Sequence, residues 1–157
     1  MSTATIYNYL KVNERLITGG QPTEAQLRAA AAEGIGIVIN LATYQVGHSL
    51  PDEAELARSL GMEYYAIPVD WERPTESDFE TFALCLNQAT GDKRLLVHCA
   101  ANYRVTAFVA LYAMKYWNWR EDQADALMAH VWRAGEYPRW DNFIQKMKLY
   151  VRAPLTP

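Results

Sequence analysis

The most distinctive chemistry of this 157-residue chain lies in one cysteine and one arginine with four residues between them. Cys99 follows the short apolar stretch Leu95–His98, which predicts a buried strand, and Arg104 precedes Val105–Trp117, which predicts a central, buried helix. Backbone N–H groups and the dipole at a helix N-terminus lower the pKa of a nearby thiol into a range of roughly 3.5 to 7.5. An arginine guanidinium binds two phosphate oxygens at once. Together these groups predict nucleophilic attack by Cys99 on a phosphate monoester.

The same residues also have structural interpretations. A lone cysteine in an apolar strand is most often a core residue, and an arginine at the start of a helix is most often on the surface. The small residues Ala100 and Ala101 favour the functional interpretation, because they let backbone amides approach a ligand closely. The other cysteine, Cys85, lies between two leucines in a predicted helix, and we expect it in the core. Two cysteines are too few for a disulfide scaffold, so both are expected to be reduced thiols.

Strand and helix patterns alternate along the chain. Strands are predicted at Arg15–Thr18, Ile35–Leu41, Met62–Val69 and Leu95–His98. Helices are predicted from Pro22-Thr23 to Gly34, where Thr23 and Gln26 have capping-box spacing, and at Asp52–Leu60, Thr75–Thr90, Val105–Trp117, Glu121–Ala134 and Trp140–Val151. This order predicts a single α/β domain over residues 1–157, with a mostly parallel sheet of about four to five strands flanked by helices. Ligands of such sheets bind beyond the carboxyl ends of the strands, so we expect the site where Leu95–His98 meets the following helix.

The charge and the composition exclude several classes of protein. Fifteen basic and eighteen acidic residues give a net charge of −3, which argues against a general nucleic-acid or polybasic membrane-binding protein. No apolar run is long enough to span a bilayer, and the N-terminus lacks the pattern of a secretory signal, so we expect a cytoplasmic protein.

The histidines do not form a metal-binding pattern. His48 and His130 are isolated, and the adjacent His98 and Cys99 point to opposite sides of a strand. We therefore predict no metal site, and the predicted reaction needs no cofactor.

The segment His98–Thr106 resembles the phosphate-binding loop of the cysteine-dependent protein tyrosine and dual-specificity phosphatases, whose pattern is His-Cys, five residues, Arg, then Ser or Thr. Further stretches resemble bacterial phosphatase-like proteins of the atypical dual-specificity group: Leu16–Pro22, Val38–Leu41, Gly61–Tyr64, Ile67–Val69 and His98–Phe108. The similarity runs from Tyr9 to Phe143, most of the chain. It implies the cysteine-phosphatase fold, which agrees with the alternation of strands and helices.

The loop departs from the family pattern in its spacing. Four residues, not five, separate Cys99 from Arg104, and Asn102 stands where the family has a glycine. Asparagine adopts a left-handed backbone more readily than most residues, so Asn102 is expected to replace the glycine. Counted from Cys99, Thr106 takes the hydroxyl position and Val105 falls where the arginine is expected. Either the loop is one residue tighter, or Arg104 reaches the anion from another direction.

The resemblance implies a role for each residue of the loop. Cys99 becomes a cysteinyl phosphate, and the equatorial oxygens are bound by Arg104 and by the amides of Ala100, Ala101, Asn102 and Tyr103. Thr106 donates to the departing thiolate, or its hydroxyl bonds its own helix backbone. His98 fixes the loop by hydrogen bonding, which a satisfied core histidine also does. Gln21 contacts the site from the Gly-Gly-Gln-Pro turn.

The relatives carry their general acid on the loop after the strand that precedes the long helix, here Val69–Pro74. Asp70 is the first choice for this acid and Glu72 the second, and in an extended stretch they point the same way, opposite to Trp71. An ordinary acidic surface loop is the alternative for both residues. Trp71 and Tyr103 are expected to line a substrate cleft or to pack under a neighbouring loop.

Three functions compete for this pattern. The first is a phosphomonoesterase that acts on a phosphorylated protein or small molecule. The second is a non-catalytic phosphate-binding module, suggested by the displaced Arg104. The third is a rhodanese-like sulfurtransferase, because those domains also place an arginine at this spacing from the cysteine. The Gly-Gly-Gln-Pro turn and the His-Cys pair resemble the phosphatases, so the sulfurtransferase is the least favoured of the three functions. Phosphotyrosine, phosphoserine, a nucleotide, a phosphoinositide and a small metabolite all fit the loop, since the depth of the cleft decides among them.

Overall fold

The computed structural model describes residues 2–89 and 91–152. Within these residues one sheet has five strands in the order β1-β2-β5-β3-β4. Their bounds are Leu10–Asn13 (β1), Leu16–Gly19 (β2), Ile35–Asn40 (β3), Glu63–Ala66 (β4) and Arg94–His98 (β5). β1 pairs antiparallel with β2, and the other pairs are parallel. The predicted α/β class and the mostly parallel sheet are confirmed.

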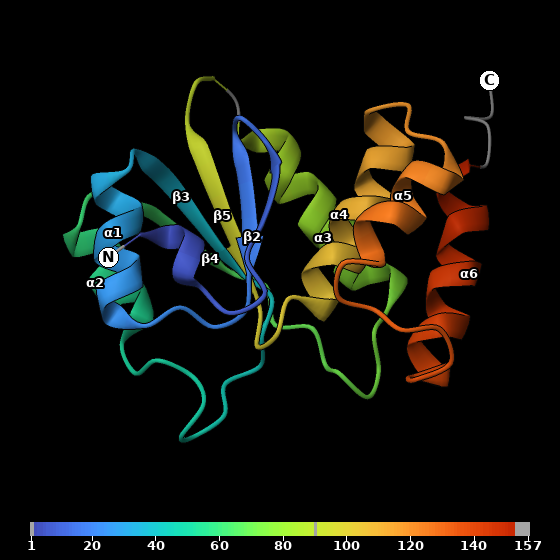
Figure 1. The fold of residues 1–157 in the computed structure, drawn as a ribbon, viewed down its shortest axis with the longest axis horizontal. Coiled ribbons are helices and arrows are strands. Elements are labelled where there is room, and N and C mark those ends of the chain that lie inside the picture. The colour runs from blue at the N-terminus through green and yellow to red at the C-terminus, as the bar shows by residue number, and fades with distance from the viewer. Residues whose placement is uncertain (1, 90, 153–157) are drawn as a thin grey trace.

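Helices cover both faces of the sheet (Figure 1). One face packs against α1 (Glu24–Ala32) and α2 (Glu53–Ser59), with alternate strand residues such as Ile17, Val38 and Leu96 in its core. The other face packs against the remaining helices, whose bounds are Glu76–Gln88 (α3), Tyr103–Tyr116 (α4), Glu121–Met128 (α5) and Pro138–Arg152 (α6). A short 3-10 helix, Thr3–Thr5, precedes β1. Residues on alternate sides of each strand therefore feed two separate apolar cores.

The local signals in the sequence explain most element boundaries. Thr23 and Gln26 form the predicted capping box of α1, and Thr75 and Asp78 form a second one at α3. Helix α4 buries eleven of its fourteen residues, as its apolar sequence predicts. The part of the chain from Leu10 to Asn13 was not predicted as a strand, because its alternation is short and its residues are partly exposed.

Some predicted elements are shorter in the structure. The strand predicted over Met62–Val69 is regular only at β4, and the helix predicted over Glu121–Ala134 ends at Met128. The helix predicted over Thr75–Thr90 ends at Gln88, and Thr90 itself lies outside the described residues. Most of the shortening is at the C-terminal ends, and element boundaries differ by a residue or two at either end.

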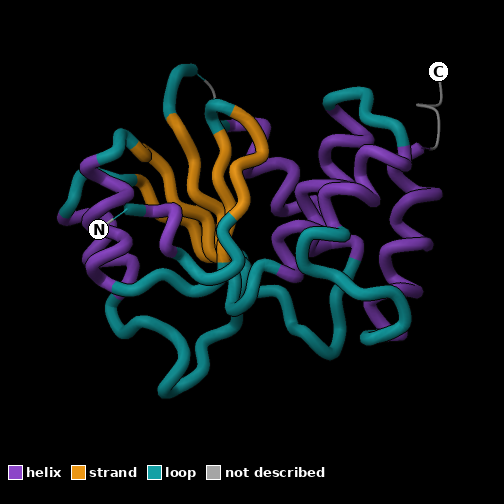
Figure 2. The backbone as a smooth tube through the Cα atoms, in the orientation of Figure 1, coloured by secondary structure: helices purple, strands orange, loops and turns teal. Residues whose placement is uncertain are grey.

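The carboxyl ends of three parallel strands lie side by side. His98 at the end of β5 stands opposite Gly19 of β2 and Asn40 of β3. The loops that follow these strands gather at one edge of the molecule, drawn at the bottom of Figure 1 and in teal in Figure 2. This edge holds the predicted site. Among the described helices, none combines the length and the apolar character that a bilayer crossing requires.

Candidate active site

The first turn of α4 begins directly after the loop that carries Cys99. Asn102 is the residue before the helix and has φ 70° and ψ 10°, the left-handed backbone expected of the residue that replaces the family glycine. Its side-chain amide nitrogen, Nδ2, donates to the Asn8 carbonyl at 2.8 Å and to the Thr18 hydroxyl at 3.0 Å. Its side chain therefore holds the loop against β2 and does not cap the helix amides.

The carbonyls of this loop are bonded to their surroundings, whereas most of its amides are not. The Ala100 carbonyl accepts from the Gln21 amide at 3.0 Å, and the Ala101 carbonyl accepts from the Asn8 side chain at 2.9 Å. Within the described residues, no hydrogen-bond acceptor is found for the amides of Ala100, Ala101, Tyr103, Arg104 and Val105. Unbonded amides at a helix N-terminus are an anion-binding arrangement.

Gly20 lets the loop approach β2 at very short range. A Cβ at Gly20 would lie 2.6 Å from the Ala100 carbonyl oxygen and 3.2 Å from the Ala101 Cα. Any side chain there would push the loop away, since real Cβ atoms do not come so close to a backbone oxygen. The Gly-Gly-Gln-Pro turn thus packs directly against the loop, because Gly20 has no side chain.

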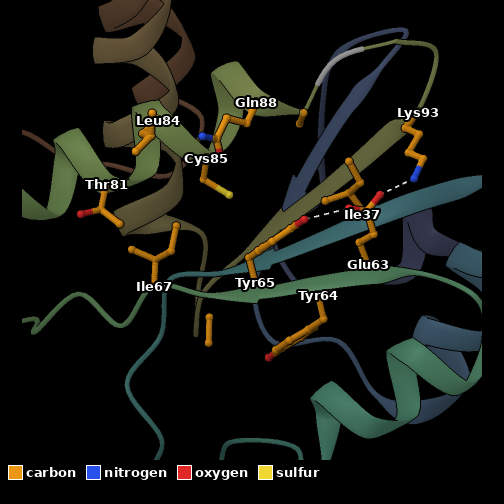
Figure 3. A pocket seen from close by; sticks show the side chains of 12 residues that line it. Ile37, Glu63, Tyr64, Tyr65, Ile67, Thr81, Leu84, Cys85, Gln88 and Lys93 are labelled. Atoms are coloured by element: carbon orange, nitrogen blue, oxygen red, sulfur yellow. Dashed lines mark hydrogen bonds and ion pairs between the residues drawn. The ribbon is translucent and has the colours of Figure 1, made fainter.

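Cys99 is a free thiol on the α3–α6 side of the sheet, with 1% of its surface exposed. Cys85 is the other free thiol, and it is half-buried rather than fully in the core. Figure 3 shows Cys85 facing a groove between β4 and α3, here called the β4–α3 groove, together with Glu63, Tyr65 and Lys93. The two thiols therefore lie in separate parts of the molecule.

Arg104 is 7% exposed, and its guanidinium lies between Val69 and Trp71. One guanidinium N–H donates to the Val69 carbonyl at 2.9 Å, and the guanidinium lies 5.9 Å from the centre of the Trp71 ring. Arg104 and Ala100 also line a cavity of about 160 Å³, here called the Arg104 cavity. The other residues that line it are Gln21, Ala42, Thr43, Gln45, His48 and Ser49.

Beneath the loop, His98 is fully buried and its Nε2 lies 2.6 Å from a carboxylate oxygen of Glu53. Its Nδ1 lies 3.3 Å from the Cys99 carbonyl oxygen. Gln21 donates to the other carboxylate oxygen of Glu53 at 2.7 Å and also lines the Arg104 cavity. Glu53 was not predicted from the sequence, because it lies 45 residues before His98 and reads as an acidic first-turn helix residue.

The Thr106 hydroxyl is bonded within its own helix. It donates to the Asn102 carbonyl at 2.8 Å and accepts from the Trp132 indole N–H at 3.1 Å. Of the two geometries open for this residue, the structure shows the local backbone bond. Trp132 is a further residue that the sequence did not single out.

The loop with Asp70 and Glu72 forms a turn, in which the Arg73 amide donates to the Asp70 carbonyl at 3.1 Å. The expectation that both carboxylates point the same way was based on an extended stretch and is wrong. Asp70 accepts from the Glu72 amide at 2.9 Å, and the Glu72 carboxylate lies 3.2 Å from Arg139 of α6. Asp70 directly follows Val69, whose carbonyl binds Arg104. Asp70 is exposed and does not line the Arg104 cavity, and the Glu72 carboxylate is directed toward α6.

Aromatic side chains join this turn to α4 and α6. The Trp71 ring stacks on Trp140 and Trp132, and Tyr103 packs against both Trp71 and Trp132. The Trp71 carbonyl accepts from the Trp140 indole at 2.8 Å. Both rings pack against neighbouring aromatic side chains, and Trp71 also lines a hollow of about 590 Å³ beside α6. No group of three or more His, Cys, Asp or Glu residues suited to a metal ion occurs in the described part of the chain.

No model of a known protein family matches the sequence. The Beta-lactamase hydrolase-like protein of Xylella fastidiosa is 30% identical over 133 residues, which are 82% of this chain, and this chain spans only 30% of the length of that curated relative. The structure of TpbA from P. aeruginosa in complex with pTyr is 12% identical, covers 98% of this chain and 94% of its own, and has a TM-score of 0.72. That match shows the fold alone.

A phosphatase-like DUF442 protein of Shewanella putrefaciens CN-32 is similar in sequence as well as in structure. Two of its crystal structures are 32% identical to this chain, with TM-scores of 0.84 and 0.85. They cover 92% and 94% of this chain, and 91% and 95% of their own. The chain therefore belongs to the DUF442 family of cysteine-phosphatase-like proteins.

Proposed function

We propose that this protein is a cysteine-dependent phosphomonoesterase in which Cys99 is the nucleophile. One observation carries the proposal: two amides of the loop, those of Ala100 and Ala101, and the first three amides of α4 have no acceptor in the described structure, and the Arg104 side chain lies at the same helix end. Such an arrangement binds a tetrahedral oxyanion, and it binds the transition state more strongly when charge builds up on the equatorial oxygens.

The reaction has two steps. The Cys99 thiolate attacks phosphorus, an S–P bond forms, and the ester P–O bond breaks with its electron pair moving to the leaving oxygen. Asp70 gives that oxygen a proton. In the second step Asp70 takes a proton from water, the water oxygen bonds to phosphorus, and the S–P bond breaks to return the thiolate and release inorganic phosphate.

Arg104 supports the phosphoryl group from the side of the Val69 carbonyl. Only one of its N–H donors has an acceptor among the described residues, and a guanidinium has five donors. The remaining donors are available to two phosphate oxygens. The shift of Arg104 by one position in the sequence is thus compatible with anion binding from the start of α4.

The small size of the Arg104 cavity limits what enters it. Its volume of about 160 Å³ is below the range of roughly 300–1,000 Å³ typical of pockets for drug-sized ligands. We expect the phosphoryl group to enter and the rest of the substrate to lie outside, against the segment 43–49. Because Cys99 is 1% exposed, the residues around its sulfur have to move before phosphorus reaches it.

A second candidate is a phosphate-binding module without turnover. The 1% exposure of Cys99 favours this second candidate. A buried thiol leaves the backbone amides able to bind an anion, but it hinders attack of the sulfur on phosphorus. Both candidates predict binding of an oxyanion, and they differ in turnover.

The test is hydrolysis of p-nitrophenyl phosphate and of phosphotyrosine, the ligand in the P. aeruginosa TpbA structure. The wild-type protein should release phosphate, and Cys99→Ser should reduce the rate by more than about 10³-fold. Cys85→Ser is the matched control, since it removes the other thiol, and it should keep the wild-type rate. Hydrolysis that survives in Cys99→Ser contradicts the proposal. Binding of phosphate without hydrolysis at any pH favours the second candidate.

A further inference from the structure

Glu53 and His98 form the most deeply buried charged pair in the described part of the chain. They are 4% and 0% exposed, and they lie directly beneath the loop that carries Cys99. Neither residue lines the Arg104 cavity. The pair therefore does not touch a bound anion, and its contacts run to the backbone of the loop instead.

The two ring nitrogens of His98 both face hydrogen-bond acceptors. Nε2 faces the Glu53 carboxylate at 2.6 Å, and Nδ1 faces the Cys99 carbonyl at 3.3 Å. A neutral imidazole has one donor and one acceptor nitrogen, so it satisfies only one of these contacts. The doubly protonated imidazolium satisfies both.

The surroundings of Glu53 favour its ionised form, as this pairing requires. Gln21 donates to one oxygen at 2.7 Å. The Tyr64 hydroxyl accepts from the Asn40 side chain at 3.0 Å and therefore has its own proton free for Glu53, with which it is hydrogen-bonded. Burial alone raises the pKa of Glu53, but the hydrogen bond and charge of His98 and the bonds from Gln21 and Tyr64 outweigh it and lower that pKa.

Two further titratable groups lie near this pair. Arg58 of α2 donates to the Tyr64 carbonyl at 3.2 Å, and its guanidinium carbon lies 6.0 Å from the centre of the Tyr64 ring. From β5 the neighbouring titratable group is the Cys99 thiol, which lies on the opposite face of the sheet. The two side chains thus face each other in a site that is closed to water.

The contact to the Cys99 carbonyl has a geometric consequence for the loop. The Cys99 C=O and the Ala100 N–H belong to one trans peptide plane and point in opposite directions. Holding the carbonyl toward His98 therefore turns the Ala100 N–H to the other side, and Ala100 lines the Arg104 cavity. The orientation of the first free amide depends on a proton at His98 Nδ1.

We infer that Glu53 is a positioning residue, which keeps His98 doubly protonated so that its Nδ1–H binds the Cys99 carbonyl and turns the Ala100 amide toward the bound oxyanion. Its effect on turnover rests on the proposed phosphatase function. The protonation of His98 does not rest on it.

The protonation state is tested in the wild-type protein by imidazole ¹⁵N NMR. Only three histidines, His48, His98 and His130, contribute signals. At pH 7 we expect both nitrogens of His98 to carry protons, and we expect one of them to lose its proton in Glu53→Gln. A neutral His98 in the wild-type protein overturns the inference, whether or not any phosphate ester is hydrolysed.

The positioning role is tested by kinetics and by anion binding. Glu53→Gln keeps the size of the side chain and should lower kcat by about 10²-fold, the scale of a displacement near 1 Å, with a smaller change in KM. Glu55→Gln, which changes an exposed glutamate in the same first turn of α2, should leave kcat unchanged. Equal kcat values for the two variants contradict the positioning role. If Glu53→Gln does not fold, the NMR measurement on the wild-type protein decides.

Discussion

The two cysteines lie in different surroundings: Cys85 lines the β4–α3 groove, whereas Cys99 is buried and directly precedes Ala100, which lines the Arg104 cavity. The β4–α3 groove has a volume of about 640 Å³, and the Arg104 cavity has about 160 Å³. In the groove, Cys85 lies in the middle of α3, where the helix amides are already bonded. Burial and the charge of Glu63 raise the pKa of the Cys85 thiol. The larger hollow thus holds a cysteine whose surroundings disfavour the thiolate.

The smaller hollow has the features that cysteine chemistry needs. It lies at the carboxyl end of β5 and at the N-terminus of α4, where free amides and Arg104 favour negative charge. Position relative to strand ends and helix ends therefore indicates function better than volume does. The following predictions compare one variant in the loop with one elsewhere, from the largest expected effect to the smallest.

Arg104→Lys should lower kcat/KM by about 10²- to 10³-fold, because lysine keeps the charge but loses the planar fork that binds two oxygens. Lys93→Arg, in the β4–α3 groove, should leave kcat/KM unchanged. Steady-state hydrolysis of p-nitrophenyl phosphate measures both. A full rate in Arg104→Lys contradicts a role for the guanidinium in the transition state.

Asp70→Asn should lower kcat by roughly 10²-fold, because the leaving oxygen loses its proton donor. Glu72→Gln should change kcat by less than about threefold, since the Glu72 carboxylate is paired with Arg139. The comparison uses the same substrate over the same pH range. If Glu72→Gln lowers kcat more than Asp70→Asn does, Glu72 is the general acid.

Gly20→Ala should destabilise the protein by about 1–3 kcal/mol and weaken phosphate binding, because the new Cβ meets the Ala100 carbonyl oxygen at 2.6 Å. Gly36→Ala meets only the flexible Lys93 side chain at 3.5 Å, and its stability should stay within about 0.5 kcal/mol of wild type. Urea denaturation measures both variants. Equal stability of the two would show that the loop tolerates displacement from β2.

Lowering the pH should reduce the stability of the protein, because acid protonates Glu53. Its folded pKa lies below the ordinary value of 4.5, so its stabilising contribution is present above that value and is lost as pH falls through the folded pKa. Stability measured between pH 6 and pH 3 should therefore fall less steeply in Glu53→Gln than in wild type. Glu63→Gln should have a smaller effect, since the ion pair of Glu63 with Lys93 is exposed. Identical slopes for wild type and Glu53→Gln contradict the buried pair.

Local patterns were enough to predict the α/β class, the position of the loop and the left-handed backbone at Asn102. They succeeded because strand and helix periods, caps and the left-handed tolerance of asparagine act within a few residues. The antiparallel β1 was not predicted, since its short strand is stabilised by pairing with β2 and not by its own apolar content.

Contacts between segments that are distant along the chain could not be predicted from the sequence. The partner of His98 is 45 residues away, and no spacing rule connects Glu53 to the loop. The turn at Asp70–Arg73 was interpreted as extended, because nothing in those residues shows that Trp71 is held by Trp140. Tertiary packing therefore decides the direction of the Glu72 carboxylate.

The central claim is that the amides after Cys99 bind a tetrahedral oxyanion. Titration of the ¹⁵N-labelled protein with inorganic phosphate tests it directly, without any need for turnover. The account predicts that the backbone signals of Ala100, Ala101, Tyr103, Arg104 and Val105 shift together with one affinity, while those of β4 and α3 stay in place. Unchanged signals across residues 100–105 at saturating phosphate, or shifts confined to the β4–α3 groove, would contradict it.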